Sequence, residues 1–182
     1  TDHFFVVTEL MERGSLDDCL EAHAAEFAWA RLGRRTLLDV AKGLLYLHGR
    51  GLVHFDVKPL NVLVSAHNVA KLSDVGLTKR LEATLTRPGG WTPAYAAPEI
   101  LARSGANEKS DIFSFGLMVW QVYTRRTPSP FEPCDVDAAW PIATVLRGSH
   151  KKSGSHSGAL ALNKWERPTA AQVKEELERL SL

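Results

Sequence analysis

The segment DIFSFGLMVWQVY, from Asp111 to Tyr123, is apolar on every side of the helix that it predicts. A surface helix keeps a polar face toward water, whereas a helix that is apolar all round is enclosed by other parts of the protein. The segment is also too short to span a bilayer, which requires about 20 apolar residues. We therefore expect it to form the central helix of a folded core.

Two further segments predict helices that could pack against such a core helix, because each has a single apolar stripe. The stripe of the first, within residues 36–48, consists of Leu37, Val40, Ala41, Leu44 and Leu45. The second begins after Thr169, which forms a capping box with Gln172 three positions later. Its stripe consists of Val173, Leu177 and Leu180. This spacing is typical of amphipathic helices.

The sequence predicts only a little β structure. Phe4–Leu10 is rich in β-branched and aromatic residues and favours a strand. Ser15 and Asp18 follow it and resemble a capping box that opens a short helix. Val62–Val64 and Val69–Leu72 flank the polar stretch SAHN and predict a hairpin-like pair of strands. The expected fold class is therefore α+β, mainly α-helical, and no internal repeat is seen.

The composition limits the classes of protein to which this chain can belong. The chain has 182 residues, enough for one sizeable domain, and its net charge is only +1. Because its basic residues are scattered, we expect no nucleic-acid partner and no membrane association. The two cysteines, Cys19 and Cys134, have neither metal-binding spacing nor a disulfide framework, which indicates a reducing compartment. We expect the cytoplasm, since the sequence shows no secretory signal.

A polar constellation follows the first amphipathic helix. HFDVKPLN, from His54 to Asn61, contains an aspartate, a lysine and an asparagine, and LSDVG further along supplies Asp74. Asn61 and Asp74 can provide the hard oxygen ligands that Mg²⁺ prefers. Lys58 can neutralise a transferring phosphoryl group, and Asp56 can accept a hydroxyl proton. These residues predict a site that holds metal and phosphate while a hydroxyl is deprotonated.

In these motifs the sequence resembles the C-terminal lobe of eukaryotic protein kinases. HFDVKPLN is similar to the catalytic loop H-R-D-x-x-x-x-N, DVG at 74–76 to D-F-G, and APE at 97–99 follows at an activation-segment distance. The long apolar helix and ERPT at 166–169 continue in the family's order. The resemblance implies a serine/threonine kinase, with the tyrosine-kinase-like group as one branch to consider. It implies a partial kinase domain over residues 1–182, consisting of the hinge and the C-lobe, with the N-lobe absent.

The resemblance implies a role for each polar residue of the constellation. Asp56 would be the catalytic base, and Asn61 and Asp74 would bind Mg²⁺. A lysine two residues after the catalytic aspartate, as at Lys58, is typical of serine/threonine rather than tyrosine kinases. Thr92 would tie the substrate-docking loop to Asp56 and Lys58. The implied cofactors are ATP and Mg²⁺, and the implied partner is a protein substrate that presents a serine or threonine hydroxyl.

Other residues are implied to bind adenine or to support the lobe. Thr8 would guard the adenine pocket, the backbone from Glu9 to Met11 would bind the adenine, and Leu63 would lie beneath the ring. The implied structural residues are Glu99, Asp111 and Arg167. The glutamate and the arginine would form a buried ion pair that fixes the end of the activation segment. The aspartate would anchor the catalytic-loop backbone from the central helix.

Two residues depart from the family pattern. Phe55 stands where the catalytic loop normally has an arginine that binds an activation-loop phosphate. We therefore predict that phosphorylation at Thr84 or Thr86 is not the main switch. Val75 replaces the phenylalanine of D-F-G and should fill less of the space beside His54, which we expect to be a core histidine.

Residues 1–182 contain no glycine-rich loop, strand lysine or helix glutamate of the kind that precedes the hinge in this family. Losing such groups should leave little turnover. It should also expose an apolar top face that includes Val7 and Leu63, which a missing N-lobe or a partner would cover.

Two other functions stay open. The first is a catalytically inactive, kinase-like module that binds partners, which Phe55 and the missing N-lobe motifs favour. The second is a small-molecule phosphotransferase, whose catalytic loop can also read H-x-D-x-x-x-x-N. Lys58, APE and ERPT argue against this second function.

Overall fold

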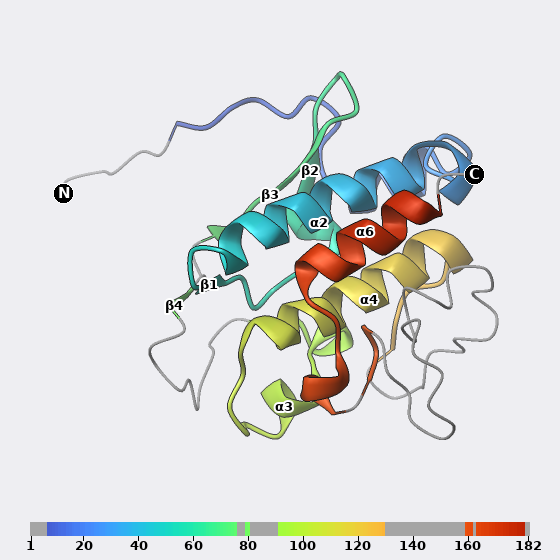
Figure 1. The fold of residues 1–182 in the computed structure, drawn as a ribbon. Coiled ribbons are helices and arrows are strands. Elements are labelled where there is room, and N and C mark those ends of the chain that lie inside the picture. The colour runs from blue at the N-terminus through green and yellow to red at the C-terminus, as the bar shows by residue number, and fades with distance from the viewer. Residues whose placement is uncertain (1–6, 76–78, 81–90, 130–158, 162, 181–182) are drawn as a thin grey trace.

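Three helices lie side by side and provide most of the core. A computed structural model describes residues 7–75, 79–80, 91–129, 159–161 and 163–180 (Figure 1). In this part of the chain, α2 (Arg34–His48) packs along α6 (Ala170–Arg179), and both lie close to α4 (Glu108–Thr124). None of the helices within these ranges combines the length and the apolar character that crossing a bilayer requires.

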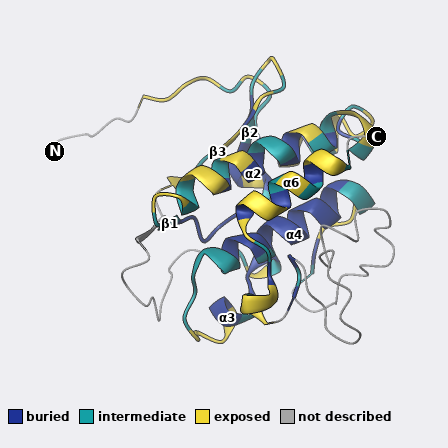
Figure 2. Ribbon diagram, viewed as in Figure 1, coloured by how far each residue is buried: buried dark blue, intermediate teal, exposed yellow. Residues whose placement is uncertain are grey.

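The helix α4 is the centre of the fold, as its sequence predicts. Every residue from Ser110 to Val122 except Phe113 is buried, and the helix is dark blue along most of its length in Figure 2. A capping box at Asn107 starts the helix. Gly116 is required where residues 159–160 pack on α4, because a Cβ atom there would lie 2.8 Å from the Cβ of Ala159.

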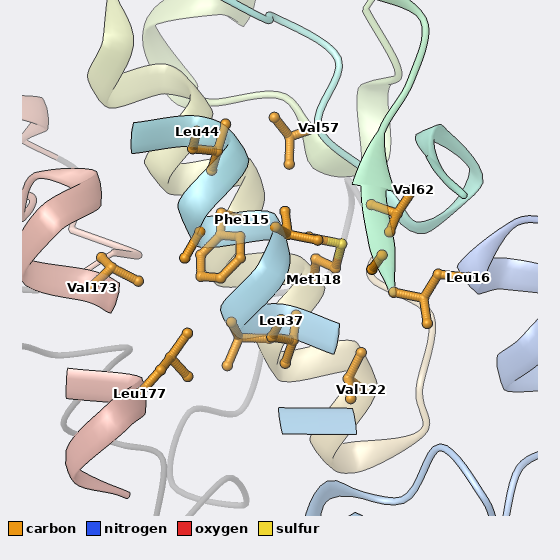
Figure 3. Close-up of a cluster of buried hydrophobic side chains, with 14 of the residues drawn as sticks. Leu16, Leu37, Leu44, Val57, Val62, Phe115, Met118, Val122, Val173 and Leu177 are labelled. Carbon is orange, nitrogen blue, oxygen red and sulfur yellow. The ribbon is translucent and has the colours of Figure 1, made fainter. Parts of the chain in front are cut away.

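The predicted apolar stripes of α2 and α6 face the core. Figure 3 shows their side chains meeting those of α4. The residues of this core that Figure 3 labels are Leu16, Leu37, Leu44, Val57, Val62, Phe115, Met118, Val122, Val173 and Leu177. Burying one such side chain contributes about 1.5–3 kcal/mol. Leu45 was expected in the stripe but is 39% exposed, because it lies at the edge of the buried face of α2.

Several short helices accompany the three long ones in the described residues. The first, α1 (Leu16–Ala22), begins with the predicted capping box, in which Ser15 and Asp18 bind each other's backbone N–H groups. The others in these ranges are α3 (Pro98–Leu101), a π-helical segment (Trp29–Gly33) and 3-10 turns at Pro59–Asn61, Pro93–Tyr95 and Lys164–Glu166.

The strands of the described part of the chain form two small antiparallel pairs. The predicted hairpin is confirmed: β2 (Val62–Val64) pairs with β3 (Ala70–Leu72), with Leu63 opposite Lys71. The second pair is β1 (Leu52–Val53) with β4 (Lys79–Arg80). The structure thus has the expected α+β content with helices predominant.

The strand predicted at Phe4–Leu10 is wrong for residues 7–10, and the rest of that prediction lies outside the described residues. Residues 7–10 form no strand, and they run away from the body of the protein (Figure 1). Val7 is 94% and Leu10 76% exposed. A strand is stable only beside a hydrogen-bonded neighbour, and no strand in the described ranges pairs with these residues.

Candidate active site

The N-terminal half of α4 carries a buried carboxylate that binds the backbone of residues 54–55. Asp111 is 0% exposed, and it accepts hydrogen bonds from the backbone N–H groups of His54 (2.9 Å) and Phe55 (2.8 Å). Its Oδ2 atom also lies 2.9 Å from Nε2 of His48 in α2. A buried carboxylate is stable only when it is paired or hydrogen-bonded. These three partners meet that need and fix the loop to the central helix.

Phe55 adopts a left-handed backbone conformation, with a φ of 68°. This region costs an L residue other than glycine about 1–2 kcal/mol, and such conformations persist where the surrounding contacts leave no alternative. Here Asp111 holds two consecutive N–H groups, and the Phe55 side chain is buried. Tertiary contacts therefore impose the shape of this loop.

His54 connects the loop to the segment that contains Asp74. The histidine is fully buried, as expected, and its Nε2 lies 2.8 Å from the carbonyl oxygen of Ser73. Its Nδ1 accepts from the backbone N–H of Asp56 (3.3 Å). Because a carbonyl oxygen only accepts, the ring proton is on Nε2. The Ser73 N–H donates in turn to the carbonyl of Asn61 (2.9 Å), so the two segments are joined twice.

The carboxylate of Asp56 is the centre of a network that joins residues far apart in the chain. Its Oδ1 accepts from the backbone N–H (3.0 Å) and the hydroxyl (2.8 Å) of Thr92. Its Oδ2 accepts from Nδ2 of Asn61 (2.9 Å) and forms an ion pair with Nζ of Lys58 (2.6 Å). Lys58 also donates to the hydroxyl of Thr92 (2.6 Å). The structure thus brings together all four residues that the sequence assigned to catalysis.

Four polar groups surround the Asp56 carboxylate, and each of its oxygens offers about two lone-pair positions. Oδ1 has two hydrogen-bond donors, whereas Oδ2 has one donor and the Lys58 ammonium at 2.6 Å. A hydroxyl that passes its proton to Asp56 therefore has to displace one of these groups. Lys58 is suited to leave, because its ammonium ends a flexible stem and its side chain retains 15% exposure.

Asn61 has an orphaned oxygen that fits a metal ligand. Its Nδ2 donates both to the backbone carbonyl (2.8 Å) and to Oδ2 of Asp56, which fixes the amide orientation. The residue is 6% exposed, and within the described residues no group donates to its Oδ1. A buried carbonyl oxygen without a donor suits a cation, and Mg²⁺ commonly takes one or two protein ligands while keeping waters and phosphates.

The second expected metal ligand, Asp74, is less constrained. It has a left-handed φ of 53° and is exposed, and its carboxylate forms no hydrogen bond with the described residues. Only the backbone of the preceding residue, Ser73, joins it to the loop. Val75 is 56% exposed and so does not fill space beside His54. Among the described residues, no group of three or more histidine, cysteine or acidic side chains could hold a metal. The pair of metal ligands expected from the sequence, Asn61 and Asp74, therefore stays a prediction.

The expected adenine-binding residues do not belong to the main core. Thr8 and Glu9 are exposed, and the carboxylate of Glu9 pairs with Lys71 of β3. Met11 and Leu63 are half-buried. The backbone that follows the expected hinge is fixed to β2 by hydrogen bonds at residues 13–14. The structure therefore places Leu63 of β2 next to the segment that follows the expected hinge. It brings neither Thr8 nor Glu9 into contact with the Asp56 network.

A third buried carboxylate, Glu99 of α3, forms a bidentate ion pair with Arg167. The two Oε–Nη distances are 2.7 and 2.9 Å, and both side chains are almost fully buried. Ser110 donates to Glu99 (2.7 Å), and Arg167 donates to the carbonyls of Ala161 (2.7 Å) and Lys109 (3.0 Å). The pair therefore joins α3, α4 and the segment before α6.

The ionisation of Glu99 reflects two opposing effects. Burial acts to raise the pKa of Glu99, but the hydrogen bonds from Arg167 and Ser110 outweigh it, so the pKa lies below the ordinary value of 4.5. The carboxylate is charged in the folded protein at neutral pH, and the ion pair is maintained.

Three supporting residues were not anticipated from the sequence. The hydroxyl of Ser114 donates to the carbonyl of Tyr95 (2.7 Å), and the Tyr95 hydroxyl donates to the side chain of Gln121. Both α4 residues are buried. They hold the one-turn helix that follows Thr92, so α4 supports both sides of the Asp56 network. The available signal was that Ser114 and Gln121 are polar residues within the predominantly apolar part of α4.

Comparison with known proteins agrees with this geometry. The family model described as "Protein kinase domain" matches residues 1–176. The proto-oncogene serine/threonine-protein kinase mos of Sus scrofa is 46% identical over 94 residues, which are 50% of this chain and 27% of that protein. The Mus musculus protein of the same name is 43% identical over 117 residues, 62% of this chain and 34% of the relative.

A viral relative gives the same result. The serine/threonine-protein kinase-transforming protein mos of Myeloproliferative sarcoma virus (isolate ts159) is 43% identical over 116 residues, 62% of this chain and 34% of that protein. The chain thus spans about a third of the length of the curated relatives that it matches. Because the family model covers nearly the whole sequence, the chain belongs to the eukaryotic protein kinase superfamily.

Proposed function

We propose that residues 1–182 form the hinge and C-terminal lobe of a serine/threonine protein kinase that transfers the γ-phosphate of ATP to protein hydroxyls. The observation that carries this proposal is the network in which the Asp56 carboxylate binds Lys58, Asn61 and Thr92 at hydrogen-bond distances. A carboxylate that is buried, charged and aimed by several donors suits proton abstraction from a hydroxyl. The names of the mos relatives support the choice of substrate hydroxyl.

The residues of the network divide the work of the reaction. Asp56 accepts the proton of the serine or threonine hydroxyl as the hydroxyl oxygen forms a bond to the γ-phosphorus of ATP. The bond between this phosphorus and the β–γ bridging oxygen breaks, and ADP leaves. Lys58 leaves the carboxylate and neutralises charge on the transferring phosphoryl group. Thr92 holds the loop that presents the substrate, because its N–H and O–H both bind Asp56. Mg²⁺ and ATP, when bound, supply the phosphoryl group and the charge that offsets its oxygens.

Asn61 and Asp74 are the residues that would hold Mg²⁺. The orphaned Oδ1 of Asn61 supports this assignment, and the exposed Asp74 carboxylate is available to a ligand. Thr8, the backbone from Glu9 to Met11, and Leu63 would hold the adenine. We also propose that an N-terminal lobe or a partner protein covers exposed apolar residues such as Val7.

The reduced thiol of Cys19 supports a cytoplasmic location. This residue is buried in the core, and burial raises the pKa of its thiol.

Nucleotide binding by the wild type and by Asp74→Ala tests the site. We expect the wild type to bind ATP only when Mg²⁺ is present, and the variant to lose this Mg²⁺-dependent binding. Asp56→Asn is the matched control, because it should retain nucleotide binding while losing transfer to a peptide. Mg²⁺-independent binding in both proteins would contradict the assignment of the metal ligands.

The competing functions predict different outcomes when the protein that contains this chain is assayed for phosphate transfer. An inactive kinase-like module would show no ATP-dependent transfer to any serine or threonine peptide. A small-molecule phosphotransferase would phosphorylate a hydroxylated small molecule but not a peptide. Transfer to peptide that Asp56→Asn abolishes is the outcome that supports the kinase.

A further inference from the structure

Phe55 is an apolar side chain in the middle of the polar loop. It is 4% exposed, although its neighbour Asp56 belongs to a hydrogen-bonded network. Five buried residues form a second apolar cluster, separate from the main core: Val53, Phe55, Ala96, Ala97 and Ile100. Trp91, Ala106 and Phe113 pack against it. We refer to these eight residues as the loop cluster.

The loop cluster contains residues on both sides of Thr92. Trp91 precedes this threonine directly, and Ala96, Ala97 and Ile100 follow it. Thr92 itself donates two hydrogen bonds to Asp56. Phe55 and Asp56, which are consecutive in the chain, therefore both hold the segment around Thr92. Phe55 does so by apolar packing, and Asp56 does so by hydrogen bonds.

The backbone at Phe55 indicates that the side chain matters. A φ of 68° favours glycine, which adopts it without strain. An aromatic residue is found there instead, with its N–H held by Asp111 and its ring in the loop cluster. The cluster contains only apolar side chains, so a charged residue at this position would lose its hydration without gaining a partner within it.

We propose that Phe55 is a positioning residue, whose packing against residues 96–100 sets the position of Thr92 relative to the Asp56 carboxylate. Without this packing, only polar contacts would hold the segment. These are the hydrogen bonds of Thr92 with Asp56 and Lys58 and those of Tyr95 with α4. The effect on catalysis rests on the proposed function, but the effect on Thr92 does not. Phe55 does not touch the reacting atoms, and it acts through Thr92 and Asp56.

Hydrogen exchange of the Thr92 amide is a direct test, because this N–H donates to Asp56 (3.0 Å). The reference is the amide of Val119 in the centre of α4, which exchanges only when the core opens. In the full-length protein that contains this chain, Phe55→Ala should raise the Thr92 exchange rate relative to Val119 by about tenfold or more. Phe55→Leu keeps an apolar side chain and should recover most of the protection.

Leu177→Ala is the control for a loss of stability alone. Leu177 is fully buried in the main core and does not belong to the loop cluster. Its truncation should raise the exchange of both amides without changing their ratio. If Phe55→Ala also left the ratio of the Thr92 and Val119 rates unchanged, the proposal would be overturned, even if the variant were less stable.

Kinetics then tests the consequence for the proposed kinase. A displacement of about 1 Å at a reacting group can cost roughly 10²-fold in rate. We expect Phe55→Ala to lower kcat/KM for the peptide by about 10–100-fold with the KM for ATP unchanged, and Phe55→Leu to restore most of it. An equal rise in the KM for ATP would oppose a positioning role at Thr92. A wild type without transfer activity would refute the proposed function and leave the exchange result standing.

Discussion

Two of the buried carboxylates near α4, Glu99 and Asp56, have cationic partners that differ in how completely they are enclosed. Glu99 is 7% exposed, and its partner Arg167 has a side chain that is 0% exposed. Asp56 is 5% exposed, but its cationic partner Lys58 keeps 15% of its side-chain exposure. The first pair is closed to water and joins three parts of the fold. The second has a cation that can move, so its charge is available for chemistry.

The largest expected effect is on activity, and it separates the two carboxylates. Asp56→Asn should reduce phosphate transfer by about 10²–10⁴-fold, because an amide cannot accept the hydroxyl proton. Its free energy of unfolding should change little, since Lys58 retains access to water. Glu99→Gln is the matched control, and its activity should fall only as far as its folded fraction does. If Asp56→Asn and Glu99→Gln were both fully folded and lost activity equally, the two carboxylates would not differ in their role in catalysis. Peptide phosphorylation and denaturant unfolding measure the two effects.

The next effect is on stability, and it compares the two cations. Arg167→Leu leaves the Glu99 charge buried without its partner, so the free energy of unfolding should fall by about 3–5 kcal/mol. Lys58→Leu should cost about 1 kcal/mol or less, as is usual for pairs with access to water. Urea unfolding followed by circular dichroism measures both variants. A larger loss in the Lys58 variant would show that the Asp56 pair is the more enclosed one.

The pH dependence of stability sharpens the same comparison. Because the folded pKa of Glu99 is lower than its ordinary value of 4.5, this carboxylate stabilises the protein above about pH 4.5. The contribution is lost as the pH falls through the folded pKa, since the unfolded state then binds the proton more readily. The difference in unfolding free energy between the wild type and Glu99→Gln should therefore shrink below about pH 4.5. A difference that stayed constant from about pH 6 to pH 3 would contradict this.

The smallest expected effect concerns Thr84 and Thr86, which lie outside the described residues. Phe55 is buried in the loop cluster, where it offers no positive charge to a phosphate. Replacing both threonines by alanine should therefore change the activity by less than about threefold. An activity assay of the double variant after phosphatase treatment tests this prediction. A loss of tenfold or more would mean that another cation binds the phosphate.

Local signals in the sequence were sufficient for most of the helices. The all-round apolar character of α4 and the capping boxes at Ser15 and Thr169 correspond to the observed elements. The hairpin of β2 and β3 also agrees. The failure at residues 7–10 has a physical cause, because a strand depends on a partner that its own composition does not specify.

The sequence alone determined the helix positions, the polar loop and the kinase family, because periodicity, capping and motif order are encoded by neighbouring residues. Only the tertiary structure decided which distant groups meet: Thr92 with Asp56, Asp111 with the backbone of residues 54–55, and Glu99 with Arg167. It also revealed that Phe55, which had been seen only as a missing arginine, is buried beside the segment that carries Thr92. Such contacts depend on how α3, α4 and the loops pack together, and no local pattern specifies that packing.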